Sequence, residues 1–267
     1  MPYKKIMRLV VGTIRCFQVA VLIIPFAVAP GTIRAQNTQR SPSEVVREFY
    51  KAMREHRFKE AWALSIYKPA VDDLTAEEME DLRATFEERA AQIPEQVDIT
   101  GEQITNNIAT VFLKVPSTEA TPQITSQPVT LILVNGNWVI GTEADAAEVK
   151  KAGRRYFLDA LITGNQGSIE DFLKGLIGVE AIYAAQHNGA FGDFPGLIKA
   201  GLLSGDAIDP KTTCYNLRVI LAADGKTFVA AGEPVRYGHT GKLSYWMDQT
   251  GNLKSLDSGG KPLKPPK

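Results

Sequence analysis

The chain has 267 residues, of which 44% are hydrophobic and 22% are charged. Residues 1–35 hold five basic residues and no acidic residue, so 25 basic and 30 acidic residues remain after them, a net charge of −5. This composition allows one large or two modest hydrophobic cores. It also argues against a nucleic-acid partner, because nucleic acids are bound by basic surfaces.

The beginning of the chain has the pattern of a secretory signal peptide. Residues 4–8 include three basic residues, an apolar stretch follows within residues 9–29, and Ala35 is a small residue before a polar boundary. The strongest apolar run, residues 17–29, is shorter than the roughly 20 residues that a membrane-spanning helix needs. We expect cleavage after Ala35 and export to the periplasm or the medium, with no membrane span afterwards. The alternative is an uncleaved anchor through residues 9–29.

Three helices are predicted next. Ser41 or Ser43 caps the first, whose apolar residues recur at helical spacing from Val45 to Met53. The second covers residues 58–66. The third begins after the cap Thr75, has acidic residues in its first turn, and ends near Gln92.

The hydrophobic period then changes to that of β-strands. Asn106-Asn107 marks a turn between two strands, and Asn135-Gly136-Asn137 marks a hairpin between Val129–Val134 and Trp138–Ile140. The segment Pro116–Ser126, rich in Pro, Thr and Ser, is interpreted as a loop.

Two segments carry a resemblance to a known superfamily. Val45–Ala63 (VVREFYKAMREHRFKEAWA) and Val129–Gly141 (VTLILVNGNWVIG) resemble the opening helix pair and the closing hairpin of the NTF2-like, cystatin-type α+β cone. The resemblance covers about residues 42–142. It implies helices packed on a curved antiparallel sheet.

The chain after Glu143 is predicted to be helical again. Residues 143–161 form a charged helical linker, which Thr163–Gly167 is expected to break. Ser168 then caps a helix that ends near Asn188-Gly189. An aromatic, glycine-rich loop at residues 189–196 and a short helix at 197–203 follow.

Strand signals make up the last part of the chain. They lie at Tyr215–Ala222, Thr227–Pro234, Leu243–Met247 and Leu253–Leu256. The segments EAIYAAQHNGAFGDFPGLIKAGLL and FVAAGEPVRYGHTGKLSYWMDQTGNL resemble the lower helix, the following loop and the sheet of a type IV pilin or pseudopilin. This resemblance covers about residues 168–256. Pilins polymerise through an apolar N-terminal helix, and no such helix is predicted before Ser168.

These observations predict an α+β protein of two domains. Its expected parts are a signal peptide or anchor at 1–35, an NTF2-like domain at 37–147, a helical linker at 148–165, a pilin-like domain at 166–257 and a disordered tail at 258–267.

Catalytic candidates are few. NTF2-like enzymes place an acid–base pair inside the cone, and the polar residues that could supply one here are Asp72, Asp73, Asp98, Glu102 and His56. None of them forms a carboxylate pair at strand positions facing a pocket. His56 is interpreted as a solvated residue of a charged turn.

The signals for metal and thiol chemistry are also weak. Glu180, His187 and Asp193 could supply three ligands, but a surface glutamate and a helix-end histidine explain the first two more simply. His239 is expected to be exposed in a turn. Cys214 is left alone once Cys16 departs with the signal peptide, and we interpret it as a small buried residue at the start of a strand. We expect no metal and no cofactor.

One aromatic group stands out in the second domain, and it leaves two interpretations open. It comprises Phe191, Phe194, Tyr237, Tyr245 and Trp246. Either the loop that carries the first two packs over the sheet, or the group forms a partner-binding surface, since aromatic residues are enriched in interface hot spots.

The sequence therefore favours an exported, non-enzymatic protein of the cell envelope that acts as a binding module. Its partner would be another envelope protein or a small ligand. The alternative is a small-molecule enzyme or carrier that uses the cone; side chains such as Phe49, Trp62 and Phe112 filling the cone would count against it.

Overall fold

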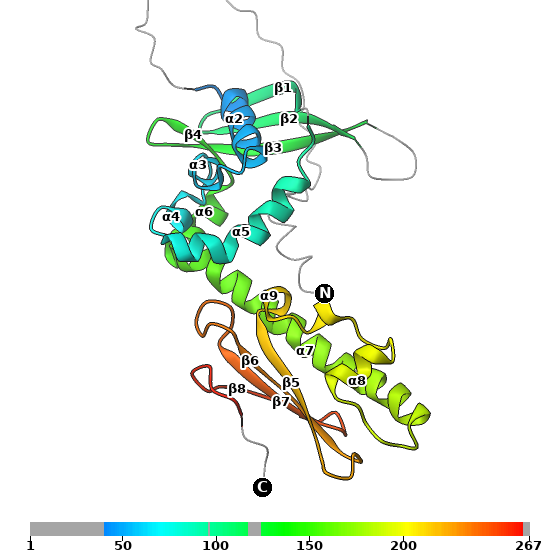
Figure 1. Cartoon of the computed structure of the whole chain (residues 1–267). Coiled ribbons are helices and arrows are strands. Elements are labelled where there is room, and N and C mark those ends of the chain that lie inside the picture. The colour runs from blue at the N-terminus through cyan, green and yellow to red at the C-terminus, as the bar shows by residue number, and fades with distance from the viewer. Residues whose placement is uncertain (1–39, 96, 117–123, 264–267) are drawn as a thin grey trace, which may run out of the picture. The chain divides into compact units, whose positions relative to one another are not determined.

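The structure, a computed structural model, describes residues 40–95, 97–116 and 124–263; the expected signal peptide lies outside these ranges. The expected α+β class is confirmed, with two four-stranded antiparallel sheets and several helices (Figure 1). Among the described helices, none has both the length and the apolar character that crossing a membrane requires.

The chain divides into two compact units. In the described ranges, unit 1 holds the residues up to Asp73 together with Phe86–Gly153, and unit 2 holds Leu74–Thr85 together with the residues from Arg154 onward. The third predicted helix, α5 (Ala76–Ala91), is therefore divided between the two units.

The first helix of unit 1, α2 (Pro42–Arg54), begins as its sequence predicts. Ser41 is the N-cap: its hydroxyl accepts from the backbone N–H of Glu44, and the Glu44 carboxylate accepts from the backbone N–H of Ser41. This reciprocal capping box satisfies two donors that the first helical turn leaves free.

Two shorter helices, α3 (Phe58–Ala63) and α4 (Lys68–Val71), follow. The helix expected to reach Ile66 ends three residues earlier, which corrects that prediction. Ile66 N–H donates to the Ile140 carbonyl at 2.9 Å, and Ile140 N–H donates to the Leu64 carbonyl at 3.0 Å. These backbone bonds to a strand edge replace helical bonds.

The sheet of unit 1 is an antiparallel meander in the order β1-β2-β3-β4. Its strands are β1 (Asp98–Thr105), β2 (Ile108–Pro116), β3 (Ile124–Val134) and β4 (Asn137–Ile140), and α6 (Glu143–Ala152) follows them. Strand β3 begins earlier than expected because Ile124 already pairs with Pro116, which shortens the predicted loop. Asn106, Asn135 and Gly136 adopt positive φ in the two predicted turns.

Helix α2 covers one face of this sheet. Val45 and Val46 pack there against alternate residues of β2 and β3 and against Trp138 of β4. The core residues supplied by the sheet are Ala109, Val111, Leu113, Val129, Leu131 and Trp138. Since strand residues alternate between faces, Phe112 points away from this core.

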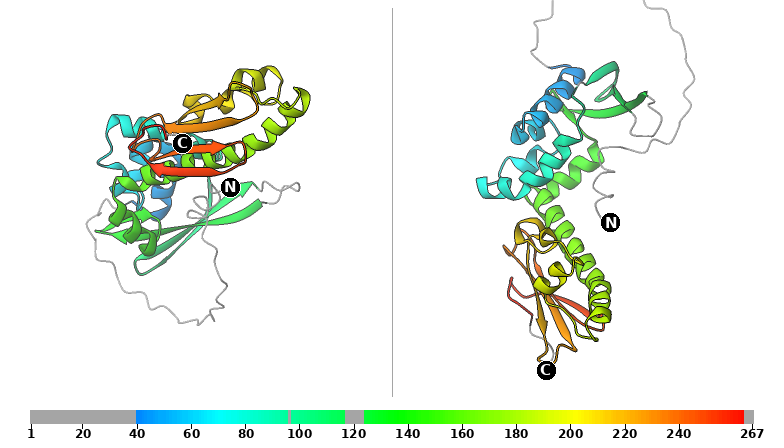
Figure 2. Two further views of the ribbon diagram at one scale, coloured as in Figure 1. Left: turned by 90° about the horizontal axis from the view of Figure 1, so that it is seen from below. Right: turned by 45° about the vertical axis from the view of Figure 1, so that its right-hand side comes forward.

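Unit 2 consists of one long helix packed on a second antiparallel sheet. The helix is α7 (Arg155–Gln186), and the strands, in the order β5-β6-β7-β8, are β5 (Tyr215–Leu221), β6 (Phe228–Pro234), β7 (Leu243–Asp248) and β8 (Leu253–Asp257). Short helices α8 (Phe194–Lys199), η1 (Gly205–Ala207) and α9 (Pro210–Thr213) lie between α7 and β5. Figure 2 shows α7 along one face of the sheet, where Ile169, Leu173 and Leu176 enter the core.

Helix α7 runs without interruption through Thr163–Gly167, so the expected helix break and the new cap at Ser168 are wrong. The polar side chains of this segment bond to the β6–β7 loop and the start of β7 instead of ending the helix. Asn165 donates to the Thr240 carbonyl at 2.9 Å, and the Gln166 side chain accepts from the backbone N–H of Leu243 at 3.2 Å. These contacts offset the roughly 1 kcal/mol that each glycine costs a helix.

Residues 258–263 belong to the segment that was expected to be a disordered tail. The Ser258 hydroxyl donates to the Ser244 hydroxyl at 3.0 Å, and a Cβ placed on Gly260 would lie 2.8 Å from the Cβ of Tyr237. Residues 258–263 are thus described with contacts to β7 and to the loop before it.

Candidate functional site

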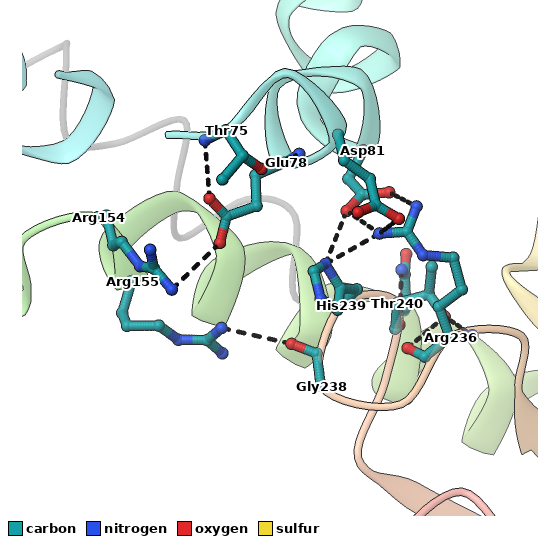
Figure 3. A network of polar contacts seen from close by, with 11 residues as sticks. Thr75, Glu78, Asp81, Arg154, Arg155, Arg236, Gly238, His239 and Thr240 are labelled. Carbon is teal, nitrogen blue, oxygen red and sulfur yellow. Dashed lines mark hydrogen bonds and ion pairs between the residues drawn. The ribbon is translucent and has the colours of Figure 1, made fainter. Parts of the chain in front are cut away.

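One connected group of charged side chains lies in unit 2. Its centre is formed by Asp81, on the part of α5 that belongs to unit 2, and by Arg236 and His239, both in the loop after β6 (Figure 3). Glu77 and Thr240 contact Arg236 directly. Separate contacts lie beside the group: Glu78 with Thr75 and Arg154, and Arg155 with the Gly238 carbonyl.

Asp81 and Arg236 form a two-pronged ion pair. The two guanidinium nitrogens of Arg236 donate to the two carboxylate oxygens of Asp81 at 2.7 and 2.9 Å. The Asp81 side chain is only 7% exposed, whereas that of Arg236 is 34% exposed. Parallel hydrogen bonds of this kind combine charge attraction with fixed orientation.

His239 completes the centre of the group. Its Nδ1 lies 3.1 Å from Oδ2 of Asp81 and 2.9 Å from a guanidinium nitrogen of Arg236. A protonated Nδ1 donates to the carboxylate, whereas an unprotonated Nδ1 accepts from the guanidinium. His239 lies in a turn, as expected; its side chain is 35% exposed and lies against this ion pair.

The surrounding residues hold the two segments in place. Arg236 N–H donates to the Thr240 hydroxyl at 3.0 Å, which fixes the loop around His239. Glu78 forms a capping box with the predicted cap Thr75 and lies 3.7 Å from Arg154. The carboxylates and cations thus satisfy one another, and the arrangement serves to dock residues 74–85 within unit 2.

Cys214 lies close to this group but does not have the properties of a nucleophile. It is half-buried, with left-handed backbone at the end of α9, rather than a fully buried strand residue as expected. Burial raises the pKa of its thiol, the Asp81 charge raises it further, and a hydrogen bond with Asn165 opposes both. Reactive thiols need the opposite environment, which stabilises the thiolate.

We expect Asp81→Asn to lower the free energy of unfolding of unit 2 by about 1–3 kcal/mol, because Arg236 loses a charged partner that is largely shielded from water. Glu77→Gln is the matched control. Glu77 also faces Arg236, at 3.1 Å, but its side chain is 67% exposed, and loss of an exposed ion pair costs about 0–1 kcal/mol. Urea denaturation of both variants measures the difference; equal effects would contradict the docking role.

The five aromatic residues predicted as a possible partner surface are not brought together on one surface. Phe194 and Tyr245 are buried in the core of unit 2, and Trp246 is also buried, on the neighbouring strand position. Phe191 is half-buried with its ring 5.0 Å from that of Phe228. Only Tyr237 is exposed, at 47%. The loop therefore packs over the sheet, which is the first of the two interpretations.

The polar residues considered for acid–base chemistry in unit 1 are exposed, and three of them, His56, Asp72 and Glu102, contact other residues. His56 stacks on Phe58, and Asp72 pairs with Lys68. Glu102 accepts from the backbone N–H of Ser43 at 2.9 Å, tying β1 to the start of α2. Asp73 and Asp98 are exposed in the segment before α5 and at the start of β1.

Aromatic rings fill the interior of unit 1 between its helices. Trp62 is 3% exposed, and its ring centroid lies 5.3–5.6 Å from those of Tyr67, Phe86 and Phe49. Arg89 covers the Trp62 ring at 5.7 Å. Phe112, named from sequence as a third filling residue together with Phe49 and Trp62, lies on the other face of the sheet.

The three residues considered as metal ligands have separate roles. His187 is the C-cap of α7 and stacks on Tyr183 at 3.8 Å, while Asp193 caps α8. Glu180 is fully buried, so the interpretation as a surface glutamate is wrong. In the ranges that the structure describes, no three histidine, cysteine or acidic residues are placed to hold a metal ion.

Sequence reasoning identified the N-cap Thr75 but missed the pairing of Asp81 with Arg236. The one available signal was helical spacing, which puts Asp81 on the same face as Glu78. Comparisons with family models, curated proteins and solved structures give no significant match to this chain. The fold and the site therefore define the class: a two-unit α+β protein with a charged docking network in unit 2.

Proposed function

We propose that this chain is an exported, non-enzymatic protein of the cell envelope that acts through protein–protein contacts. In this proposal unit 1 is an NTF2-like domain and unit 2 a pilin-type domain. The helix-on-sheet arrangement of each unit is compatible with these families, and the segments quoted above carry the resemblance.

The observation that carries the proposal is the filled interior of unit 1. An NTF2-like enzyme or carrier needs an open space between the helices and the sheet for its substrate. Here Val45 and Val46 of α2 belong to the same buried core as the inward-facing residues of β2 and β3. Trp62, Phe86 and Tyr67 fill the region between the helices with edge-on and tilted ring contacts. Such contacts stabilise a core, and they leave surface binding as the better-supported mode of action.

The surface of unit 2 offers a place for such contacts. Val235, Tyr237 and Leu256 are exposed at 42%, 47% and 60%, respectively. The Tyr237 hydroxyl donates to the Asp257 carboxylate at 2.9 Å, so the ring is held in place by the residue next to Leu256. A held, exposed tyrosine is a typical interface anchor, because little side-chain entropy is lost when it binds.

Site-specific photo-crosslinking in the cells that produce the protein tests this proposal. A photoreactive aromatic residue at position 237 should give a discrete crosslinked protein adduct in the envelope fraction. The same residue at Thr212, which is exposed on α9 in the same unit, is the control and should give none.

Two results would contradict the proposal. One is a protein found in the cytoplasmic fraction, which would reject export. The other is the same adduct pattern at positions 237 and 212, or none at either, which would reject the Tyr237 surface.

A further inference from the structure

A carboxylic acid occupies a core position of α7. The buried residues of this helix follow helical spacing from Ile169 through Leu173 and Leu176, and Glu180 takes the next position on the same face. The residue is 0% exposed. Acidic residues are almost never fully buried unless they are paired, so this position needs an explanation.

The pairing of this carboxyl is incomplete. Its Oε2 accepts from the backbone N–H of Gly192 at 2.9 Å, whereas Oε1, also buried, has no hydrogen-bond partner among the described residues. Gly192 allows the close approach, since a Cβ there would lie 3.0 Å from both Leu197 and Tyr183. One hydrogen bond thus ties α7 to the segment that leads into α8.

No cation compensates the carboxyl within this described part of unit 2. Asp193, in the loop, is the charged group that acts on it, and its sign is the same. On α7, His187 stacks on Tyr183 and its Nδ1 lies against the Tyr183 carbonyl. In the β5–β6 hairpin, Nζ of Lys226 donates to the Asn188 carbonyl at 2.6 Å.

The remaining titratable groups nearby point elsewhere. Asp224 of the hairpin accepts from the Lys226 backbone, and Lys199 at the end of α8 is exposed. Burial is the main reason that the pKa of Glu180 lies above its ordinary value. The Gly192 N–H opposes this shift, and the Asp193 charge adds to it.

We propose that Glu180 is a proton-controlled latch: its neutral form holds the segment 188–199 closed against α7, and its ionised form releases it. The latch is a property of unit 2 and does not depend on export or on the Tyr237 surface. A neutral carboxyl keeps the bond from Gly192 without an uncompensated charge in the core. An ionised carboxyl next to Asp193 disfavours the closed form, and opening the segment lets water reach it.

The direction of the pH effect follows from the raised pKa. Between the pKa of the open form and that of the closed form, the closed form binds more protons. The closed segment therefore has its full stability at pH values below the ordinary glutamate range and loses stability as the pH rises through the pKa of the closed form. Opening would expose Phe191 and Phe194, which the segment carries.

Hydrogen exchange of the full chain between pH 5 and pH 8 tests the latch. The measured exchange rate of peptides covering residues 188–197, divided by the intrinsic exchange rate of the same sequence when unfolded, gives the opening equilibrium. In the natural protein we expect opening to increase severalfold as the pH rises over this range, because the closed form then loses its proton. Glu180→Gln, which keeps an acceptor for Gly192 but cannot ionise, should change by less than about twofold.

Two further variants make the test decisive. Glu170→Gln is the matched control on the same helix, because Glu170 is exposed and paired with Lys174; it should behave like the natural protein. Asp193→Asn keeps an α8 cap but removes the neighbouring charge, so it should reduce the pH effect. This variant decides the matter if Glu180→Gln fails to fold. A pH effect that persists in Glu180→Gln, stays undiminished in Asp193→Asn, or disappears in Glu170→Gln would overturn the latch.

Discussion

Replacing Phe194 by alanine is expected to lower the free energy of unfolding of unit 2 by about 3–5 kcal/mol. Phe194 is 7% exposed and is part of the core that α7 forms with the sheet, and its ring lies 6.3 Å from that of Phe172. Because Asp193 caps α8 just before it, the ring is held at the first helical position, and truncation leaves a cavity that the fixed segment cannot close.

Urea denaturation, followed through hydrogen exchange of the strands β5–β8, measures this change for unit 2 alone. Phe191→Ala is the control in the same loop; Phe191 is half-buried and packs on Phe228, so the loss should be clearly smaller. If Phe194→Ala lowered the free energy of unfolding of unit 2 by less than about 1 kcal/mol, the loss would be smaller than truncation of a buried aromatic residue causes. That result would mean that the loop is not part of the core.

Replacing Trp62 by alanine is expected to have an effect of the same size, about 3–5 kcal/mol, on unit 1. Its ring contacts those of Phe49, Tyr67 and Phe86, so its loss affects packing from three directions. Urea denaturation followed through hydrogen exchange of β2 and β3 measures this loss of stability.

Phe112→Ala provides the comparison within unit 1. Phe112 is half-buried on the sheet face away from α2, against Gly101, and its truncation should cost distinctly less. If the two variants lost equal stability, the helices would not enclose a core centred on Trp62. The space between them would then again be available to a ligand.

Local features of unit 1 could be predicted from sequence because neighbours along the chain determine them. The Ser41 capping box needs only Glu44, three residues away, and the turn at Asn135-Gly136 needs only residues that tolerate positive φ. The strands of unit 2 were also located to within one or two residues, since their alternation and the turn at Gly225 are local.

The charged group around Asp81 could not be predicted in this way. Asp81 and Arg236 are 155 positions apart, and neither position shows its partner in the sequence. His239 looked like an ordinary turn residue because the loop that brings it to Asp81 is held by Thr240 and by the ion pair itself. Likewise, the aromatic group was recognised as a set, but only packing separated buried Phe194 from exposed Tyr237.

The sequence alone determined which segments are helical or extended, because hydrophobic period, caps and turn residues act over a few positions. The tertiary structure decided where α7 begins and what it buries. Asn165 and Gln166 continue the helix because the β6–β7 loop and the start of β7 provide partners for their side chains. Glu180 enters the core because the segment after α7 folds back and supplies the Gly192 N–H. Long-range hydrogen bonds and burial of this kind outweigh local propensities of about 1 kcal/mol.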